Sequence, residues 1–339
     1  MPSSICSRAP PAGLARAVYP HDAAQRDHGE PRSILDAGMK CIRCGFWRCV
    51  CPNPATMPTQ LAGDYPKVAH QNVAAVALRA WCNLPKYLGS PFNGPSVDAF
   101  NTASTWLRDG FDADVRVVLD SGCGTGMSTR NLARLHPDAA VIGVDRSAAR
   151  LGKSRGVELP DNALLVQAEL ATFWRLLLEA DFDAAEPGLS EAAPLKASRV
   201  ARHWMLYPNP YPKPARLNLR WHGHPSLPCL LAIGDEIEVR SNWRVYLDEF
   251  ETATSLLARR AGNGAESDDD ELSMAGLSLQ RQRTLQTVRN RVGRLGVGNG
   301  APIEALRLAS VEDAITPFEA KFHANGEALW RLAMRRGKV

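Results

Sequence analysis

The sequence lacks any hydrophobic run long enough to cross a membrane. A spanning helix needs about 20 consecutive apolar residues, and no segment of the 339-residue chain approaches that length, although 45% of its residues are hydrophobic. The first residues also lack a continuous apolar stretch after their basic side chains, so we expect no secretory signal. Together these absences predict a cytoplasmic protein that has no membrane partner.

The chain also lacks a strong charge of either sign. Its 40 Lys and Arg residues against 36 Asp and Glu residues leave a formal charge of +4. This mildly basic balance permits a nucleic-acid partner but does not require one. The length suits one sizeable α/β domain with appendages, or two domains. The composition leaves the oligomeric state open between monomer and homodimer.

Cysteine is scarce outside one cluster. Of the eight cysteines, four follow the pattern C-x2-C-x4-C-x-C, at Cys41, Cys44, Cys49 and Cys51. Four thiolates at this spacing are able to close around one zinc ion, although the C-x-C half is less usual because its ligands must turn back sharply. Reduced cysteines without a metal stay an alternative, and an iron–sulfur cluster is a less favoured one. We predict an N-terminal arm over 1–68 that carries the cluster.

The most informative stretch covers residues 115–145. A short apolar run over 115–120 predicts a strand buried on both faces. The glycine-rich segment 121–126 follows it and leads into helical spacing over 129–135. A second apolar run then ends in Asp145. This is one β-α-β unit, whose ligand is expected at the carboxyl ends of its strands.

Details of this unit favour S-adenosylmethionine over a dinucleotide. The glycines Gly122, Gly124 and Gly126 have the spacing G-x-G-x-G, and not the G-x-G-x-x-G that lays a pyrophosphate on a helix end. Asp145 is placed to accept hydrogen bonds from both ribose hydroxyls. Asp120 would face the ligand's amino group or ordered water. A doubly wound domain whose glycine turn binds another ligand stays an alternative.

The remaining chain predicts a doubly wound α/β domain over 112–339, preceded by a helical lead-in over 69–111. A third strand over 164–169 would place Glu169 beside the adenine. Further strands are expected within 201–207 and 235–243. Late strands are expected over 303–308 and 328–334.

A proline-rich turn follows the expected strand over 201–207. Prolines fix φ and restrict the residues before them, so Asn209 and Tyr211 would be held in preset positions suited to a planar base. A simple stiff connection is the alternative. The polar residues that follow suggest contacts with phosphate: Arg216, Asn218, Arg220, His222 and His224. A basic amphipathic helix over 277–295 would lie along an RNA backbone or present a solvated face.

From about residue 112 to its end, the chain resembles bacterial tRNA (guanine-N7-)-methyltransferases. Four motifs of that family recur in order, within 121–126, 208–213, 241–243 and 316–321. The resemblance implies a Rossmann-like class I methyltransferase, with a mostly parallel doubly wound sheet, a late antiparallel strand, S-adenosylmethionine as cofactor and tRNA as partner. The cysteine cluster more weakly resembles the start of DTW-domain proteins, a family that includes tRNA aminocarboxypropyltransferases.

The same resemblance implies roles for individual residues. Asn209, Lys213 and Asn242 would form the catalytic centre. Substrate contacts would come from Lys213, Asn242, Thr316, Phe318 and Glu319. The cofactor would be held by Asp120, Gly122, Gly124, Gly126, Asp145, Glu169 and Asn209.

Two positions depart from the family pattern, because Asn209 and Asn242 stand where the family has acids. Guanine N7 loses no proton on methylation, so no general base is required. A carboxylate would nevertheless stabilise the positive charge that develops on the ring, whereas an amide supplies only a dipole. The sequence therefore leaves three functions open: a tRNA guanine methyltransferase, a methyltransferase of another substrate, and a non-catalytic homologue that binds S-adenosylmethionine or RNA.

Overall fold

A seven-stranded sheet forms the centre of the computed structural model, which describes residues 70–154, 156–181, 195–263, 277–296 and 303–337. Its strand order is β3-β2-β1-β4-β5-β7-β6. The strands are β1 (Arg116–Ser121), β2 (Ala139–Asp145), β3 (Ala163–Gln167), β4 (Val200–Leu206), β5 (Glu236–Ser241), β6 (Ile303–Leu306) and β7 (Leu329–Arg335). β1 to β5 pair in parallel, and β7 runs antiparallel to both β5 and β6. The predicted fold class is thereby confirmed.

The chain reverses direction across the sheet between β3 and β4. It builds β1, β2 and β3 outward to one edge, then returns so that β4 pairs with the other side of β1. Ligands bind at such a switch point, outside the carboxyl ends of the strands. Every residue of β2 is buried, as the apolar run in its sequence predicts for a strand covered on both faces.

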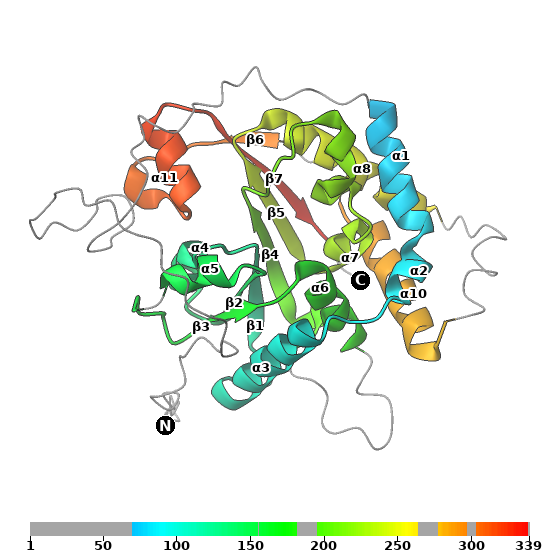
Figure 1. Cartoon of the computed structure of the whole chain (residues 1–339), viewed down its shortest axis with the longest axis horizontal. Helices are drawn as coiled ribbons and strands as arrows, with labels where there is room; N and C mark the ends of the chain where they lie inside the picture. Colours follow the sequence, from blue (N-terminus) through cyan, green and yellow to red (C-terminus); the bar gives the residue numbers. More distant parts are fainter. Residues whose placement is uncertain (1–69, 155, 182–194, 264–276, 297–302, 338–339) are drawn as a thin grey trace, which may run out of the picture.

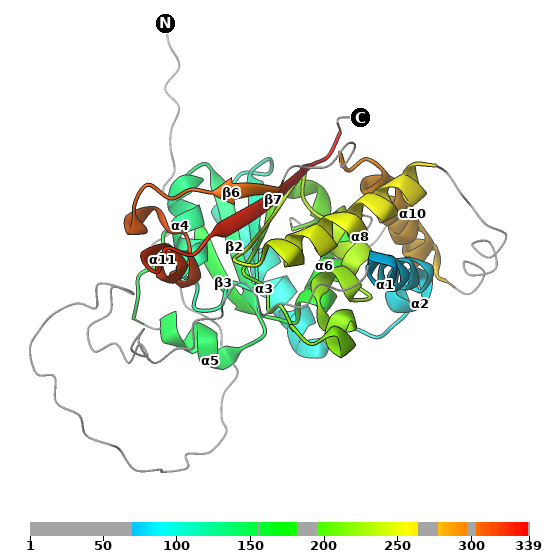
Figure 2. The ribbon, with the colours of Figure 1, turned by 90° about the horizontal axis from the view of Figure 1, so that it is seen from above.

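Helices cover both faces of the sheet (Figures 1 and 2). On one side lie α1 (His70–Cys82), α2 (Leu84–Leu88), α7 (Leu227–Ala232), α8 (Arg244–Gly262) and α10 (Leu279–Gly293), with α3 (Gly94–Gly110) packed against α6 (Leu170–Glu179). On the other side lie α4 (Met127–Leu135), α5 (Ala148–Leu151) and α11 (Pro317–Ala324). Within the described ranges, no helix has the length and hydropathy that a membrane span requires.

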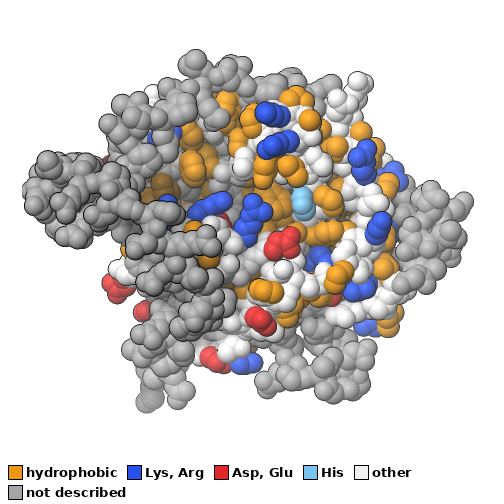
Figure 3. All heavy atoms as spheres, viewed as in Figure 1, with side chains coloured by type: hydrophobic (Ala, Val, Ile, Leu, Met, Phe, Trp, Pro, Cys, Tyr) orange, Lys and Arg blue, Asp and Glu red, His pale blue; other side chains and the backbone are white. Residues whose placement is uncertain are grey.

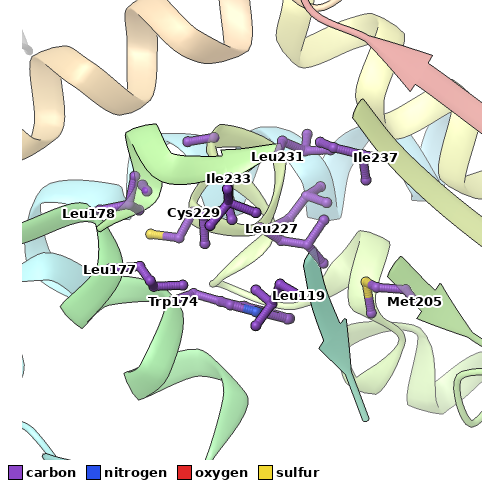
Figure 4. Close-up of a cluster of buried hydrophobic side chains, with 14 of the residues drawn as sticks. Leu119, Trp174, Leu177, Leu178, Met205, Leu227, Cys229, Leu231, Ile233 and Ile237 are labelled. Carbon is purple, nitrogen blue, oxygen red and sulfur yellow. The ribbon is translucent and has the colours of Figure 1, made fainter. Parts of the chain in front are cut away.

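The main core lies between the sheet and the α7 side (Figure 4). Leu119 of β1 and Met205 of β4 face the fully buried Trp174 of α6 and the apolar side chains of α7. Residues of the helical lead-in, such as Val73 of α1 and Phe100 of α3, belong to the same core. The lead-in therefore packs as part of the sheet domain.

The basic helix α10 is partly internal. Leu285, Val288 and Val292 are fully buried, as its helical spacing predicts. Arg291 is buried too, and its Nε donates a hydrogen bond to the carbonyl of Ala232 at the end of α7. Arg291 therefore lies on neither an RNA-facing nor a solvated face of this helix.

The close packing of α4 on the sheet requires a residue without a side chain at Gly143. A Cβ atom at this position would lie 2.2 Å from Thr129 Oγ1 and 2.7 Å from Leu165 Cδ2. We expect Gly143→Ala to lower the free energy of unfolding by roughly 1–3 kcal/mol, the usual cost of overpacking. Urea unfolding measures this change. Gly110→Ala is the matched control, since nothing lies within 4 Å of a Cβ there; equal losses in both variants would contradict the close packing.

Candidate active site

A cavity of about 280 Å³ opens at the carboxyl ends of β1, β2, β3 and β4. This is the position that the switch point of the sheet predicts. The loop between β4 and α7 supplies many of the lining residues. The lining residues are Ser121, Gly122, Asp145, Arg146, Arg150, Glu169, Leu170, Ala171, Leu206, Tyr207, Pro208, Asn209, Tyr211, Leu219, Trp221 and His224.

The glycine turn joins β1 to α4 through three left-handed residues. Gly122, Gly124 and Gly126 have φ values of 84°, 59° and 72°, a region that residues with a Cβ rarely adopt. The N–H of Gly122 donates to the carbonyl of Val144 at 2.8 Å, which holds the turn against the end of β2. Gly122 is exposed in the cavity, and open space surrounds its missing Cβ. A ligand is therefore able to approach this backbone closely.

Asp145 ends β2 at the edge of the cavity, with only 3% of its surface exposed. Its Oδ2 accepts hydrogen bonds from the N–H of Gly124 at 3.0 Å and from Arg150 Nη1 at 3.3 Å. Its Oδ1 accepts from the N–H of Ser147 at 2.8 Å. These bonds fix the carboxylate, and the exposed Arg146 lies beside it on the cavity wall.

Asp120 is directed away from the cavity, which differs from its expected position. It is 1% exposed, and its Oδ2 accepts hydrogen bonds from Ser128 Oγ at 2.6 Å and Thr129 Oγ1 at 2.7 Å. These bonds tie β1 to the first turn of α4. Burial raises the pKa of Asp120 to about 6, and the two hydroxyl donors oppose that rise only in part.

Ser121 links the cavity to the core through a buried polar chain that the sequence analysis missed. Its Oγ lies 2.8 Å from His203 Nε2 and accepts a hydrogen bond from Trp174 Nε1 at 3.1 Å. Burial lowers the pKa of His203 to about 3, so the imidazole is neutral near pH 7. These hydrogen bonds position the end of β1. No local sequence pattern predicts them.

The turn after β4 brings Asn209 and Tyr211 to the cavity, as its prolines predict. Tyr207 and Tyr211 adopt left-handed backbones, with φ values of 53° and 41°. Asn209 Oδ1 accepts a hydrogen bond from the N–H of Tyr211 at 3.2 Å, which closes the turn. Such non-glycine conformations cost about 1–3 kcal/mol each and persist only where surrounding contacts impose them.

Arg220 supplies those contacts from inside the protein. It is fully buried; its Nε donates to the carbonyl of Tyr211 and its Nη2 to that of Pro212, both at 3.2 Å. Arg220 also forms an ion pair with the buried Glu249, and His222 Nε2 lies 3.1 Å from the same carboxylate. The expectation that Arg220 and His222 contact phosphate is therefore wrong, because both are engaged inside the protein.

Trp221 and His224 complete the wall opposite Asp145. The ring of Trp221 packs edge-on against Trp174, with centroids 4.8 Å apart, and against His224 at 5.2 Å. His224 Nδ1 accepts a hydrogen bond from the N–H of Ser226 at 3.2 Å. Sequence reasoning missed Trp221 and assigned His224 to phosphate. Their position in the loop directly after the proline turn could have indicated that both residues reach the cavity.

Of the residues expected to hold the cofactor, Gly124 and Gly126 lie outside the cavity lining, and so do five residues expected to contact substrate. Thr316 and Glu319 form the capping box that begins α11, and Glu319 is completely buried. Phe318 is exposed on the same helix. Asn242 is half-buried after β5, and Lys213 is exposed at the end of the proline turn.

Comparison with known proteins matches part of the chain to a family model. Residues 118–185 match a family model described as "Methyltransferase domain". The chain carries a class I methyltransferase domain. A trans-aconitate 2-methyltransferase of Deinococcus radiodurans is 50% identical over 44 residues, 13% of this chain and 17% of the relative.

Two further similarities come from RNA methyltransferases. A tRNA (guanine-N(7)-)-methyltransferase of Christiangramia forsetii is 28% identical over 126 residues, 36% of this chain and 48% of that protein. The solved 16S rRNA (adenine(1408)-N(1))-methyltransferase from Catenulisporales acidiphilia is 17% identical, with a TM-score of 0.34, covering 74% of this chain and 96% of that one. The matched regions span 17% of the length of the Deinococcus relative and 48% of the length of the Christiangramia relative.

The cavity of the methyltransferase domain suits S-adenosylmethionine, the methyl donor of this class. The bare backbone at Gly122 and the fixed carboxylate of Asp145 lie on one wall. Glu169, exposed at the start of α6, also lines the cavity. The predicted cysteine cluster lies outside the described residues. Within the described part of the chain, no group of three or more potential ligands could hold a metal, so zinc gains no support.

The raised pKa of Asp120 predicts that the free energy of unfolding depends on pH. Between about pH 4 and pH 6, the folded protein binds this proton more tightly than the unfolded chain does, because its folded pKa is raised. The free energy of unfolding should therefore fall as the pH rises through this window. Asp120→Asn cannot ionise, so we expect wild type to lose about 3 kcal/mol relative to this variant between pH 4 and pH 7. Urea unfolding at each pH measures the difference, and a pH-independent difference would contradict the raised pKa.

Proposed function

We propose that this protein transfers a methyl group from S-adenosylmethionine to N7 of a guanine in tRNA. The observation that carries the proposal is the two-sided cavity. One side has the glycine turn and the carboxylate of Asp145, and the other has the aromatic side chains of Tyr207, Tyr211 and Trp221. The first side suits the cofactor, and the second suits a planar base.

Aromatic walls and cationic surroundings favour a nucleic-acid base as substrate. Unpaired bases bind by stacking on aromatic side chains, while nearby cations hold the phosphates. Arg146 and Arg150 line the cavity, and Lys213 and Arg216 are exposed along the loop after β4. Lys and Arg side chains also border the hydrophobic area at the centre of the face in Figure 3.

The assignment to tRNA guanine N7 is supported by the relative that bears this name and by the order of the four motifs. When bound, S-adenosylmethionine supplies an electrophilic methyl group on a sulfonium sulfur. The acceptor N7 has a free lone pair, so the protein needs to orient the base and exclude water, and not to remove a proton. Asp145 would accept hydrogen bonds from the ribose hydroxyls, and the aromatic wall would hold the guanine ring. Asn209 would present an amide dipole beside the site.

Incubation of the purified protein with S-adenosylmethionine and unmodified tRNA tests this function. We expect 7-methylguanosine to appear in the nucleosides of the digested tRNA. Its rate should be low, because an amide replaces a charge-stabilising carboxylate, a loss of about 10²–10³-fold by analogy with the deletion of an oxyanion-hole donor. Asn209→Asp should therefore increase the rate. The absence of methylated nucleosides with both proteins, across several tRNA pools, would contradict the proposal.

A second candidate is methylation of a small carboxylic acid. Arg146 and Arg150 line the same cavity, and guanidinium groups bind carboxylates in a bidentate manner. The Deinococcus relative is named for such a substrate. Methylation of trans-aconitate without methylation of tRNA would favour this candidate. If methyl transfer is detected only in the double variant that carries both Asn209→Asp and Asn242→Asp, the natural protein is a non-catalytic homologue.

A further inference from the structure

His224 is a hydrogen-bonding residue of the cavity whose ring is fixed by its neighbours. It is half-buried, and the ring of Trp221 packs edge-on against its imidazole with centroids 5.2 Å apart. Its Nδ1 accepts a hydrogen bond from the N–H of Ser226 at 3.2 Å and lies 2.7 Å from Ser226 Oγ. Ser226 is completely buried, so these contacts give the imidazole a rigid support.

The contact with Ser226 determines which nitrogen of His224 carries the proton. A backbone N–H group can only donate, so Nδ1 is an acceptor, and the proton of a neutral imidazole then belongs to Nε2. Burial lowers the pKa of His224, and the carboxylate of Glu169 opposes that change only in part, so the ring is neutral near pH 7. Nε2 is therefore a hydrogen-bond donor that carries no positive charge.

The Nε2–H group of His224 is available to a ligand. Within the described part of the chain, no hydrogen bond involves Nε2, and Nε2 is also not one of the buried side-chain atoms that lack a partner. The atom is therefore accessible, and His224 lines the cavity. It lies beside Trp221, one of the aromatic residues that the proposed function gives to the base.

A neutral donor in this place matches one edge of guanine. Beside N7, guanine presents the carbonyl oxygen O6 as an acceptor, whereas adenine presents the donor N6–H₂. The Nε2–H of His224 would bind O6 but would meet a second donor at N6. A Lys or Arg side chain would also donate, but its charge would oppose the positive charge that develops on the ring during N7 methylation.

We propose that the Nε2–H of His224 donates a hydrogen bond to O6 of the target guanine and thereby selects guanine over adenine. This inference rests on the proposed function, since it takes N7 of a purine as the methyl acceptor. Adenine is rejected because two donors would face each other in the cavity without an acceptor. Ser226 is a positioning residue, because it holds the imidazole with Nδ1 as acceptor.

Fluorescence anisotropy with short labelled RNAs tests the contact in the presence of S-adenosylhomocysteine. The probes are oligouridylates with one central guanine, inosine or adenine; inosine keeps O6 but lacks the 2-amino group. We expect wild type to bind the guanine and inosine probes more tightly than the adenine probe. His224→Phe keeps a ring but removes the donor. It should raise the dissociation constants of the guanine and inosine probes about three- to tenfold, the loss of one neutral hydrogen bond, and that of the adenine probe less than about twofold.

Matched variants and probes separate this contact from a structural role. His224→Gln keeps N–H donors and should retain the preference for guanine, whereas His136→Phe makes the same change at the end of α4, outside the cavity lining, and should have no effect. Thermal melting checks the fold of each variant. A 2-aminopurine probe lacks O6 and needs no variant; it should bind wild type more weakly than the guanine probe does.

Equal affinity of wild type and His224→Phe for the guanine probe would overturn the inference. An equal loss with all probes would also overturn it, because the ring would then support the wall without reading the base. So would a matching loss of affinity for S-adenosylhomocysteine alone, because His224 would then hold the cofactor.

The outcomes for His224 and for the proposed function differ. If wild type methylates tRNA and His224→Phe keeps the full preference for guanine, the role of His224 is overturned while the function stands. If the preference for guanine depends on His224 but no tRNA guanine is methylated, the role of His224 stands while the tRNA assignment falls.

Discussion

The pairing of β1 with β2 on one side and β4 on the other determines where the site lies. It brings the glycine turn, Asp145 and the proline turn to one edge of the sheet, although Gly122 and Asn209 are far apart in the chain. The hydrogen bonds of Ser121 with His203 and Trp174 then anchor the end of β1 to β4 and α6. Without this pairing, neither wall of the cavity would face the other.

Two buried ion pairs support the cavity wall formed by the loop after β4. Arg220 with Glu249 holds the carbonyls of the proline turn, and Arg240 with Glu319 holds Tyr207 from the other side. Removing one partner of such a pair is costly, because it leaves a buried charge without compensation. The two pairs thus maintain strained backbone conformations that the turn could not hold alone.

The sequence predicts the β-α-β unit well because its information is local. Apolar runs, glycines and a terminal acid follow one another within 31 residues, and the structure places Gly122 and Asp145 in one cavity. The prediction is weaker where a role depends on distant contacts. Glu319 belongs to a motif near the end of the chain, yet its contacts with Tyr207 and Arg240 are what bury it. Arg220 resembles a surface cation in sequence, but its ion pair with Glu249 and its hydrogen bonds to the proline turn explain its burial.

Asp120 shows the same limit at the scale of one side chain. Its place at the end of β1 suggests a ligand contact, but Ser128 and Thr129 in the first turn of α4 donate hydrogen bonds to its carboxylate. Trp221 and His224 reach the cavity only because the loop after β4 folds back over it. No periodicity in the sequence indicates that path.

We infer that Asp145 closes a site for the methyl donor at this sheet edge. Calorimetric titration of the full chain with S-adenosylhomocysteine tests it most directly, since this product analogue binds without reacting. We expect one site per chain, and a dissociation constant about tenfold or more higher in Asp145→Ala, the usual loss for hydrogen bonds to a charged group. No binding by wild type, or equal affinity in the variant, would contradict it.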